Sequence, residues 1–224
     1  MSEAPTNPML KRILIAIAGV TILGVVLLYL LATYPAGEYR VADELRARGF
    51  KVWYSRRNDT VMQHPADMIW QHPNNVVGTD RSITPDDCRL ICQLPRLQGL
   101  GFERCDFSES NLDDVGNCRE LTSFCCDDVT QLSAVEMEKL AACPVTVIML
   151  RNAHLTDYDL EAFAGLTKLM YLDLEENIEI TDAGLEHLEK IASLQFLCLP
   201  KTSVTKDGVR EFQKKRPDVK VFFE

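Results

Sequence analysis

Residues 169–199 read LMYLDLEENIEITDAGLEHLEKIASLQFLCL, and this stretch decides the fold. Its first six residues, from Leu169, have apolar side chains at the first, fourth and sixth places, which indicates a short buried strand. Behind Thr181, apolar residues follow at the spacing of one helical face: Leu185, Leu188 and Ile191. The strand pattern then returns at Leu194. The stretch therefore predicts a unit of one short strand, a turn and one helix.

The same unit recurs along the chain. An apolar residue followed by Ser or Thr marks each turn, and successive hydroxyl residues are 24, 25, 23, 25 and 24 positions apart: Thr84, Ser108, Ser133, Thr156, Thr181 and Thr205. The strand pattern begins six times: at Leu97, Leu121, Val145, Leu169, Leu194 and Val219. Self-similarity at a period of about 20–29 residues with Leu-x-x-Leu-x-Leu predicts a solenoid. We expect an α/β fold with stacked parallel strands on a concave face and helices on the convex face.

The Thr-Asp pair at 181–182 invites a catalytic interpretation, but its repetition favours a structural one. A hydroxyl at the start of a helix can accept a hydrogen bond from an unpaired backbone N–H. Asp157 and Asp182 stand beside such a hydroxyl, near the positive end of the helix dipole. We therefore expect Thr181 and Asp182 to stabilise the helix start.

With these motifs in place, the chain resembles the leucine-rich repeat family, in its cysteine-containing form with an "ITDAGL" helix start. The resemblance covers residues 83–224 and is closest to membrane-tethered bacterial repeat proteins. The place that the family usually fills with Asn, Cys or Thr holds, in order, Cys105, Val129, Ala153, Asn177 and Thr202. The resemblance implies a binding module that is not an enzyme and that needs no cofactor.

Residues 13–33 form an uncharged apolar stretch, ILIAIAGVTILGVVLLYLLAT. As a helix of 21 residues it reaches roughly 31 Å, enough to span a bilayer core. We expect a single-pass transmembrane helix after an N-terminal tail at 1–12, a linker with a helix and strand cap at 34–75, and the repeat domain at 76–224. Lys11 and Arg12 precede the helix and favour a cytoplasmic N-terminus with an exported repeat domain.

Charge and composition narrow the partner class. The net charge is -9 and the sequence pI is near 5.0, and no basic stripe is visible, so we expect no nucleic-acid partner. The four histidines lie in different contexts, none in register with a Ser or Cys nucleophile, which favours binding over catalysis.

The third and fifth places of each strand are predicted to face the concave side. In the last four turns these places carry apolar and aromatic residues, which are typical of interaction sites. We take as candidate partner-binding residues Val147, Met149, Tyr171, Asp173, Phe196, Val221 and Phe223. The alternative is a structural envelope protein that self-associates through the free edge of the C-terminal strand, giving a homo-oligomer.

Cysteines and carboxylates leave smaller possibilities open. Cys118 and Cys143 occupy nearly equivalent places in adjacent helices, so a disulfide between them is conceivable in an exported domain. Cys88 and Cys92 with His64 or His72 offer zinc-ligand types, but structural zinc sites favour tighter and paired spacings. Carboxylates after the strands could bind calcium, but they alternate with other residues along a solvated border that includes Arg151. We therefore expect no metal.

Overall fold

Eight strands lie side by side in chain order in a single sheet. β1 (Lys51–Ser55) is antiparallel to β2 (His72–Ser82), and every later neighbour is parallel. The remaining strands are β3 (Gly99–Asp106), β4 (Ser123–Asp127), β5 (Val147–Arg151), β6 (Tyr171–Asp173), β7 (Phe196–Cys198) and β8 (Lys220–Phe222). The parallel solenoid expected from the repeats is confirmed.

The computed structural model describes residues 36–55, 72–108, 112–130, 132 and 134–223. The expected tail at 1–12 and transmembrane helix at 13–33 lie outside these residues. Among the residues that are described, no helix combines the length and the apolar character needed to cross a bilayer.

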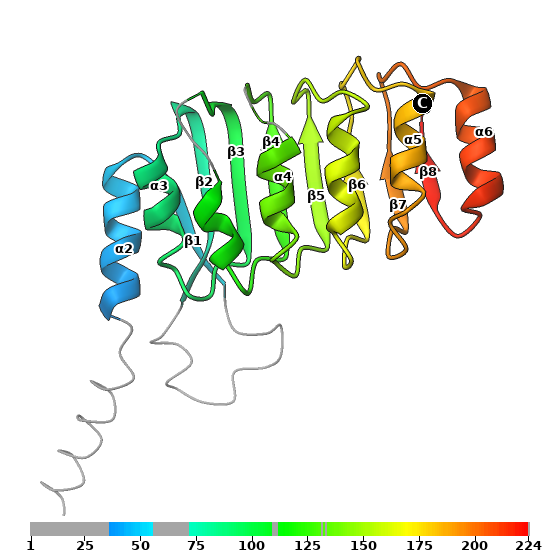
Figure 1. Cartoon of the computed structure of the whole chain (residues 1–224). Helices are drawn as coiled ribbons and strands as arrows, with labels where there is room; N and C mark the ends of the chain where they lie inside the picture. Colours follow the sequence, from blue (N-terminus) through cyan, green and yellow to red (C-terminus); the bar gives the residue numbers. More distant parts are fainter. Residues whose placement is uncertain (1–35, 56–71, 109–111, 131, 133, 224) are drawn as a thin grey trace, which may run out of the picture. The chain divides into compact units, whose positions relative to one another are not determined.

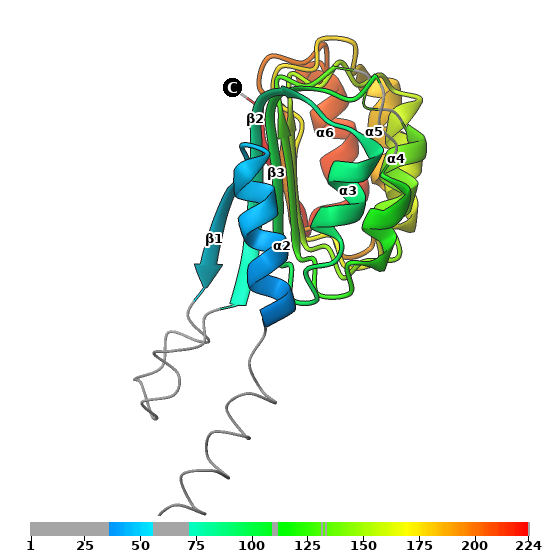
Figure 2. The same cartoon turned by 90° about the vertical axis from the view of Figure 1, so that its left-hand side faces the viewer.

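Helices cover one face of the sheet and leave the other open (Figures 1 and 2). Four of the covering elements are α-helices: α3 (Pro85–Ile91), α4 (Ala134–Leu140), α5 (Asp182–Leu188) and α6 (Lys206–Lys215). In two turns the expected helix is instead a 3₁₀ helix: η2 (Asp113–Asn117) and η3 (Asp159–Gly165). Leu160, Ala162 and Phe163 are the buried residues of η3, and the two large ones, Leu160 and Phe163, are spaced by three, which matches about three residues per turn.

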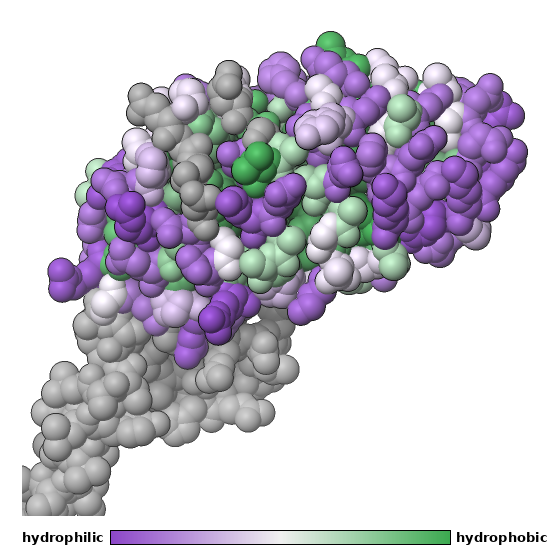
Figure 3. Space-filling model, in the orientation of Figure 1, coloured by the Kyte–Doolittle hydropathy of each residue, from purple (hydrophilic) through white to green (hydrophobic). Residues whose placement is uncertain are grey.

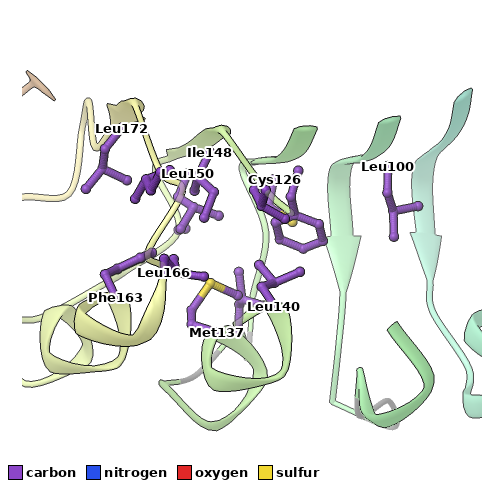
Figure 4. Close-up of a cluster of buried hydrophobic side chains, with 14 of the residues drawn as sticks. Leu100, Cys126, Met137, Leu140, Ile148, Leu150, Phe163, Leu166 and Leu172 are labelled. Carbon is purple, nitrogen blue, oxygen red and sulfur yellow. The ribbon is translucent and has the colours of Figure 1, made fainter. Parts of the chain in front are cut away.

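The core lies between the sheet and the helices. Leu121, Val145, Leu169 and Leu194 are 0–1% exposed, one from each of four consecutive turns. Figure 4 shows how side chains from strands and helices meet, with Ile148 and Leu150 of β5 toward Met137 and Leu140 of α4. Each such buried side chain contributes about 1.5–3 kcal/mol relative to exposure. A unit alone could not bury its leucines, so the turns stabilise one another.

The N-terminal end of this core is covered by α2 (Ala36–Ala47), a helix within the segment 34–75 that was expected to hold a helix and strand cap. Leu45 and Phe50 belong to the buried cluster. The chain leaves this helix through Gly49, whose φ of 90° suits glycine, while the backbone N of Phe50 donates to Leu45 O at 2.9 Å. Arg48 joins this cap to α3 through Asp87, at 3.1 Å.

Threonines start several covering helices, as expected. Thr84, Thr181 and Thr205 are N-cap residues whose side chains accept from Asp87 N, Ala183 N and Gly208 N respectively. At Thr84 the Asp87 side chain also accepts from the Thr84 backbone N, at 3.1 Å. Burial alone would raise the pKa of Asp87, but hydrogen bonds from Thr84 and Arg48 outweigh it and lower that pKa. Each cap of this kind contributes about 1 kcal/mol.

Candidate functional site

The strand register places two columns of side chains on the open face of the sheet, the face opposite the helices. The first column runs through Trp53, Asn75, Gly99, Ser123, Val147, Tyr171, Phe196 and Lys220. The second runs through Lys51, Val77, Gly101, Cys125, Met149, Asp173, Cys198 and Phe222. Five of the seven candidate residues therefore share one surface: Val147, Met149, Tyr171, Asp173 and Phe196.

For Val221 and Phe223 the sequence-based register was wrong. The Cα partner of Phe196 is Lys220, so β8 occupies a register one residue away from the expected one. A shift by one residue turns every side chain to the other face of the sheet. Val221 and Phe223 pack against the core, and Phe222, 40% exposed, takes the open-face position.

Apolar side chains gather on the C-terminal half of the open face. We call this group the apolar patch; it comprises Cys125, Val147, Met149, Tyr171, Phe196, Cys198 and Phe222. The rings of Tyr171 and Phe196 lie 6.4 Å apart between centroids. The Tyr171 hydroxyl is 3.3 Å from Cys198 Sγ, and this hydrogen bond, with partial burial, raises the pKa of Tyr171 to about 12. Tyr171 is thus held as a neutral phenol beside the exposed edge of Phe196.

Asp173 differs from the other candidate residues because it is only 2% exposed. Arg151 lies over it, with Nε and a terminal nitrogen 2.9 and 2.8 Å from Asp173 Oδ2. The hydrogen bond to Asp173 raises the pKa of Arg151. The group presented to solvent at this position is therefore the Arg151 side chain, which the sequence places among the charged residues that follow the strands.

In the N-terminal half of the open face, side chains of neighbouring strands pack tightly over two glycines. A Cβ at Gly99 would lie 2.1 Å from Asn75 Oδ1, and one at Gly101 would lie 3.0 Å from a Val77 methyl group. Both glycines are buried, so their neighbours fill the space in front of them. Among the described side chains of β1 and β2, the exposed large apolar one is Trp53 of β1, at 48%.

A second feature, missed by the sequence analysis, is a column of left-handed residues where the strands end. We call it the rim; φ lies between 46° and 65° at Asp80, Arg104, Asp128, Asn152, Glu176 and Lys201. Consecutive members are 24 or 25 residues apart, which is the repeat period. Their side chains pair across turns: Arg104 with Asp80 at 2.9 Å, Asn152 with Asp128 at 2.8 Å, and Lys201 with Glu176. The regular spacing was visible in the sequence, but no glycine marked these positions.

Beside the rim, acidic side chains surround a shallow pocket of about 210 Å³. Its lining residues are Glu103, Asp127, Asp128, Arg151, Glu175 and Glu176. Burial raises the pKa of Asp127 despite the attraction of Arg151, and Asp127 Oδ1 is a buried oxygen without a hydrogen-bond partner. Within the described residues, no group of three or more His, Cys, Asp or Glu side chains could hold a metal ion. Five of the six lining residues are acidic, so the pocket presents negative charge to solvent.

The helical face is a different surface. Figure 3 shows hydrophilic residues over the α5 and α6 end of this face and hydrophobic ones gathered across its middle. Single exposed apolar residues there include Val135 on α4, 58% exposed, and Tyr158 before η3, 74% exposed.

The cysteines are free thiols. Cys143, the expected neighbour of Cys118, does not make the sulfur–sulfur contact with it. Cys118 Sγ lies 3.1 Å from Cys92 Sγ, whereas Cys143 Sγ donates to Val115 O at 3.1 Å. The thiols of Cys125 and Cys126 lie on opposite sides of β4, the first half-buried and the second buried.

Comparison with protein families matches residues 144–203 to the leucine-rich repeat model. Comparison with curated proteins finds no match. Among solved structures, a leucine-rich repeat protein of Leptospira interrogans is 20% identical with a TM-score of 0.45, covering 60% of this chain and 33% of its own. An internalin of Listeria monocytogenes is 13% identical with a TM-score of 0.36, covering 60% of this chain and 49% of its own. This chain thus spans less than half the length of either protein, and its repeat architecture rests on the register of its own strands.

Proposed function

Since the chain is a leucine-rich repeat protein, we propose that it is a non-enzymatic interaction module that binds a protein partner through the apolar patch on its open face. Repeat solenoids offer extended surfaces for recognition. The observation that carries the proposal is the alignment of Val147, Tyr171 and Phe196 in one column on three adjacent strands. Contiguous apolar surface rimmed by polar residues is typical of interaction sites.

The charged residues around the apolar patch indicate which charges a partner would carry. Carboxylates of Glu103, Asp127 and Glu175 line the pocket at one border, and Lys220 stands at the other end of the column. A partner segment with apolar or aromatic side chains in its centre and basic residues toward the pocket would complement this arrangement. Tyr171 and Phe196 would supply the buried centre of the interface, where aromatic residues contribute most.

Site-directed photo-crosslinking in the full chain tests this proposal. A photoreactive phenylalanine analogue replaces Phe196 on the open face or Tyr158 on the helical face; both native residues are aromatic and exposed. We expect crosslinked protein adducts from position 196 that disappear when Tyr171→Ala is added, and none of the same mass from position 158. Equal adducts from both positions, or adducts that survive Tyr171→Ala, would contradict use of the apolar patch.

A second candidate function is self-association. β8 is the last strand in the sheet order, and Phe222 beside its edge is 40% exposed. A free edge can pair with another strand through its backbone. Sedimentation across a hundredfold concentration range separates the two functions, because a dimer would dissociate on dilution and a Val221→Pro variant would remain monomeric. A monomer at every concentration would remove this alternative.

We also propose that residues 13–33 tether the repeat domain to a membrane, with the N-terminus cytoplasmic and the repeats exported. The support is the uncharged length of this stretch and the position of Lys11 and Arg12 before it. Alkaline extraction of membranes followed by protease treatment of intact cells tests both parts. Release of the chain by carbonate would contradict the tether, and protection of the repeats in intact cells would contradict their export.

A further inference from the structure

Two thiols from consecutive turns of the solenoid lie in contact. Cys92 is the C-cap residue of α3 and Cys118 is the C-cap residue of η2, so both occupy the same place in their turns. Their sulfur atoms are 3.1 Å apart although the residues are separated by 26 positions in the chain. A disulfide bond has an S–S length of about 2.05 Å. The sulfurs therefore need to approach by only about 1 Å for a bond to form.

Burial and hydrogen bonding distinguish Cys92 and Cys118 from the other cysteines as a pair that could form a disulfide. Cys92 is half-buried and Cys118 is buried, so one thiol can meet a reagent from solvent while the other is held behind it. Cys143 occupies the corresponding region of the next turn, but its Sγ donates to Val115 O. Cys88, in the middle of α3, is 1% exposed. The geometry thus offers one exchange-competent pair.

We propose that Cys92 and Cys118 form a disulfide that links the first two turns of the solenoid, by exchange with a disulfide-bearing oxidant. The oxidant is a protein or small-molecule disulfide, R–S–S–R. The Cys92 thiolate attacks one oxidant sulfur, which breaks the oxidant S–S bond and releases one thiolate, R–S⁻. The Cys118 thiolate then attacks Cys92 Sγ, which forms the Cys92–Cys118 bond and releases the second R–S⁻. The two cysteines lose two protons and two electrons, and the oxidant is reduced to two thiols.

The bond would matter most where the solenoid begins. It would close a loop between α3 and η2, and a closed loop lowers the conformational entropy of the unfolded chain. In an oxidising compartment the link would be permanent, and in a reducing one the thiols would stay as a contact pair. The inference is independent of the apolar patch, because neither cysteine lies on the open face.

Peptide mapping of the full chain tests the pairing directly. The reduced protein is incubated with oxidised glutathione, free thiols are blocked, and trypsin is added without a reductant. Cleavage after Arg89, Arg96, Arg104 and Arg119 puts Cys92 in peptide 90–96 and Cys118 in peptide 105–119. We expect these two peptides to be linked, with fragment ions that place the bond on Cys118 and not on Cys105. The link should vanish in Cys92→Ser and Cys118→Ser and persist in the matched control Cys143→Ser.

A thermal measurement on the wild-type chain does not depend on the folding of Cys118→Ser. The oxidised wild-type chain should unfold about 5–10 °C above the same chain in reductant, as a typical disulfide in a domain of this size would give. Cys92→Ser, at the more accessible position, should show no such difference. The proposal is overturned by a dominant Cys118–Cys143 link, by a link that forms only in denaturant, or by equal unfolding temperatures with and without reductant.

Discussion

The carboxylate of Asp157 accepts two hydrogen bonds from Thr181, one from its backbone N at 2.8 Å and one from its hydroxyl at 2.6 Å. The two residues are 24 positions apart and begin consecutive covering helices. Asp182 accepts from Thr205 in the same way, at 2.7 Å for both atoms. The acidic residue of the Thr-Asp pair thus joins its own turn to the next one, in addition to lying near a helix start. At Thr181 and Thr205 the same threonine therefore both starts its helix and bonds to the preceding turn.

A glycine three residues after each donating threonine, Gly184 after Thr181 and Gly208 after Thr205, makes room for this link. A Cβ at Gly208 would lie 2.0 Å from Asp182 Oδ1, so Gly208→Ala must displace the carboxylate from Thr205. Alanine is otherwise favoured in a helix by about 1 kcal/mol. We expect Gly208→Ala to lower the free energy of unfolding by about 1–2 kcal/mol, because the lost hydrogen bonds involve a charged group.

A double-mutant cycle followed by urea unfolding checks this prediction. In an Asp182→Ala background the obstacle is gone, so Gly208→Ala should become neutral or stabilising, with a coupling energy of about 1 kcal/mol or more. Gly37→Ala, where no atom lies within 4 Å of the added Cβ, is the matched control and should not destabilise. Additive effects of Asp182→Ala and Gly208→Ala would show that the contact is unimportant.

Asn177 is the most demanding single position in the repeats. Its side chain is 0% exposed, donates to Leu150 O at 2.6 Å and Leu174 O at 2.9 Å, and accepts from Ala153 N and Leu155 N at 3.0 and 3.1 Å. Asn177→Leu would remove the side-chain partner of these four buried backbone groups, although Leu174 O would keep the backbone N of residue 177 at 3.4 Å. We expect a loss of at least about 3 kcal/mol in the free energy of unfolding, since each unpaired buried group costs about 1–3 kcal/mol.

Urea unfolding of Asn177→Leu is compared with Thr202→Val. Thr202 fills the equivalent place one turn later, where its hydroxyl donates to Leu199 O at 2.8 Å. The Thr202 variant loses one hydrogen bond and should be destabilised by only about 1 kcal/mol. Comparable losses at both positions would contradict this prediction, because the four hydrogen bonds of Asn177 would then stabilise the fold no more than the single one of Thr202.

Replacing Val221 or Phe222, the last two residues of β8, tests its register. Val221 packs against the core and Phe222 is 40% exposed. We expect Val221→Ser to lower the free energy of unfolding by about 1–2 kcal/mol through lost apolar burial, and Phe222→Ser by less than half as much. Thermal and urea unfolding of the two variants give the comparison, and the opposite order would restore the register expected from the sequence.

The sequence predicted the architecture well because its signals are local and repeated. Leu169 and Leu194 begin the same strand pattern, and Thr181 and Thr205 mark the same cap. The register of β8 could not be predicted in this way, because VKVFF has apolar residues that satisfy either alternation. The Asp157–Thr181 link and the burial of Asp173 under Arg151 also depend on how neighbouring turns align in space, and no single turn contains that information.

The left-handed rim escaped prediction for a different reason. Only the spacing of Asp80, Arg104, Asp128, Asn152, Glu176 and Lys201 marks it. Non-glycine residues adopt this conformation rarely and at a cost, with Asp and Asn the most tolerant. Arg104, Glu176 and Lys201 are not residues from which a left-handed turn would be expected, and hydrogen bonds to adjacent turns help to hold them there.

Asp127 gives a prediction that connects stability with the proposed partner surface. Burial raises the pKa of its carboxyl above the ordinary value, so the charged form is less stable in the folded chain than in the unfolded chain. Below the unfolded pKa of about 3.9 the carboxyl is protonated in both states and contributes nothing. Above the folded pKa the charge destabilises the fold. Asp127→Asn should therefore raise the free energy of unfolding at pH 7 by up to about 1 kcal/mol, reduced by solvent screening, and this gain should fade as the pH falls toward 4.

Urea unfolding of wild type and Asp127→Asn from pH 3.5 to 7.5 measures the difference, with Asp80→Asn as the control of opposite sign. The hydrogen bond from Arg104 lowers the pKa of Asp80, so its charge stabilises the fold above the unfolded pKa and this stabilisation is lost as the pH falls through the lower folded pKa. Asp80→Asn should consequently destabilise the chain at pH 7. If Asp127→Asn were destabilising at neutral pH, the buried oxygen would have a favourable partner in the fold. If it is stabilising and also weakens crosslinking at position 196, the carboxylate is retained at a cost to stability because a basic group of the partner binds it.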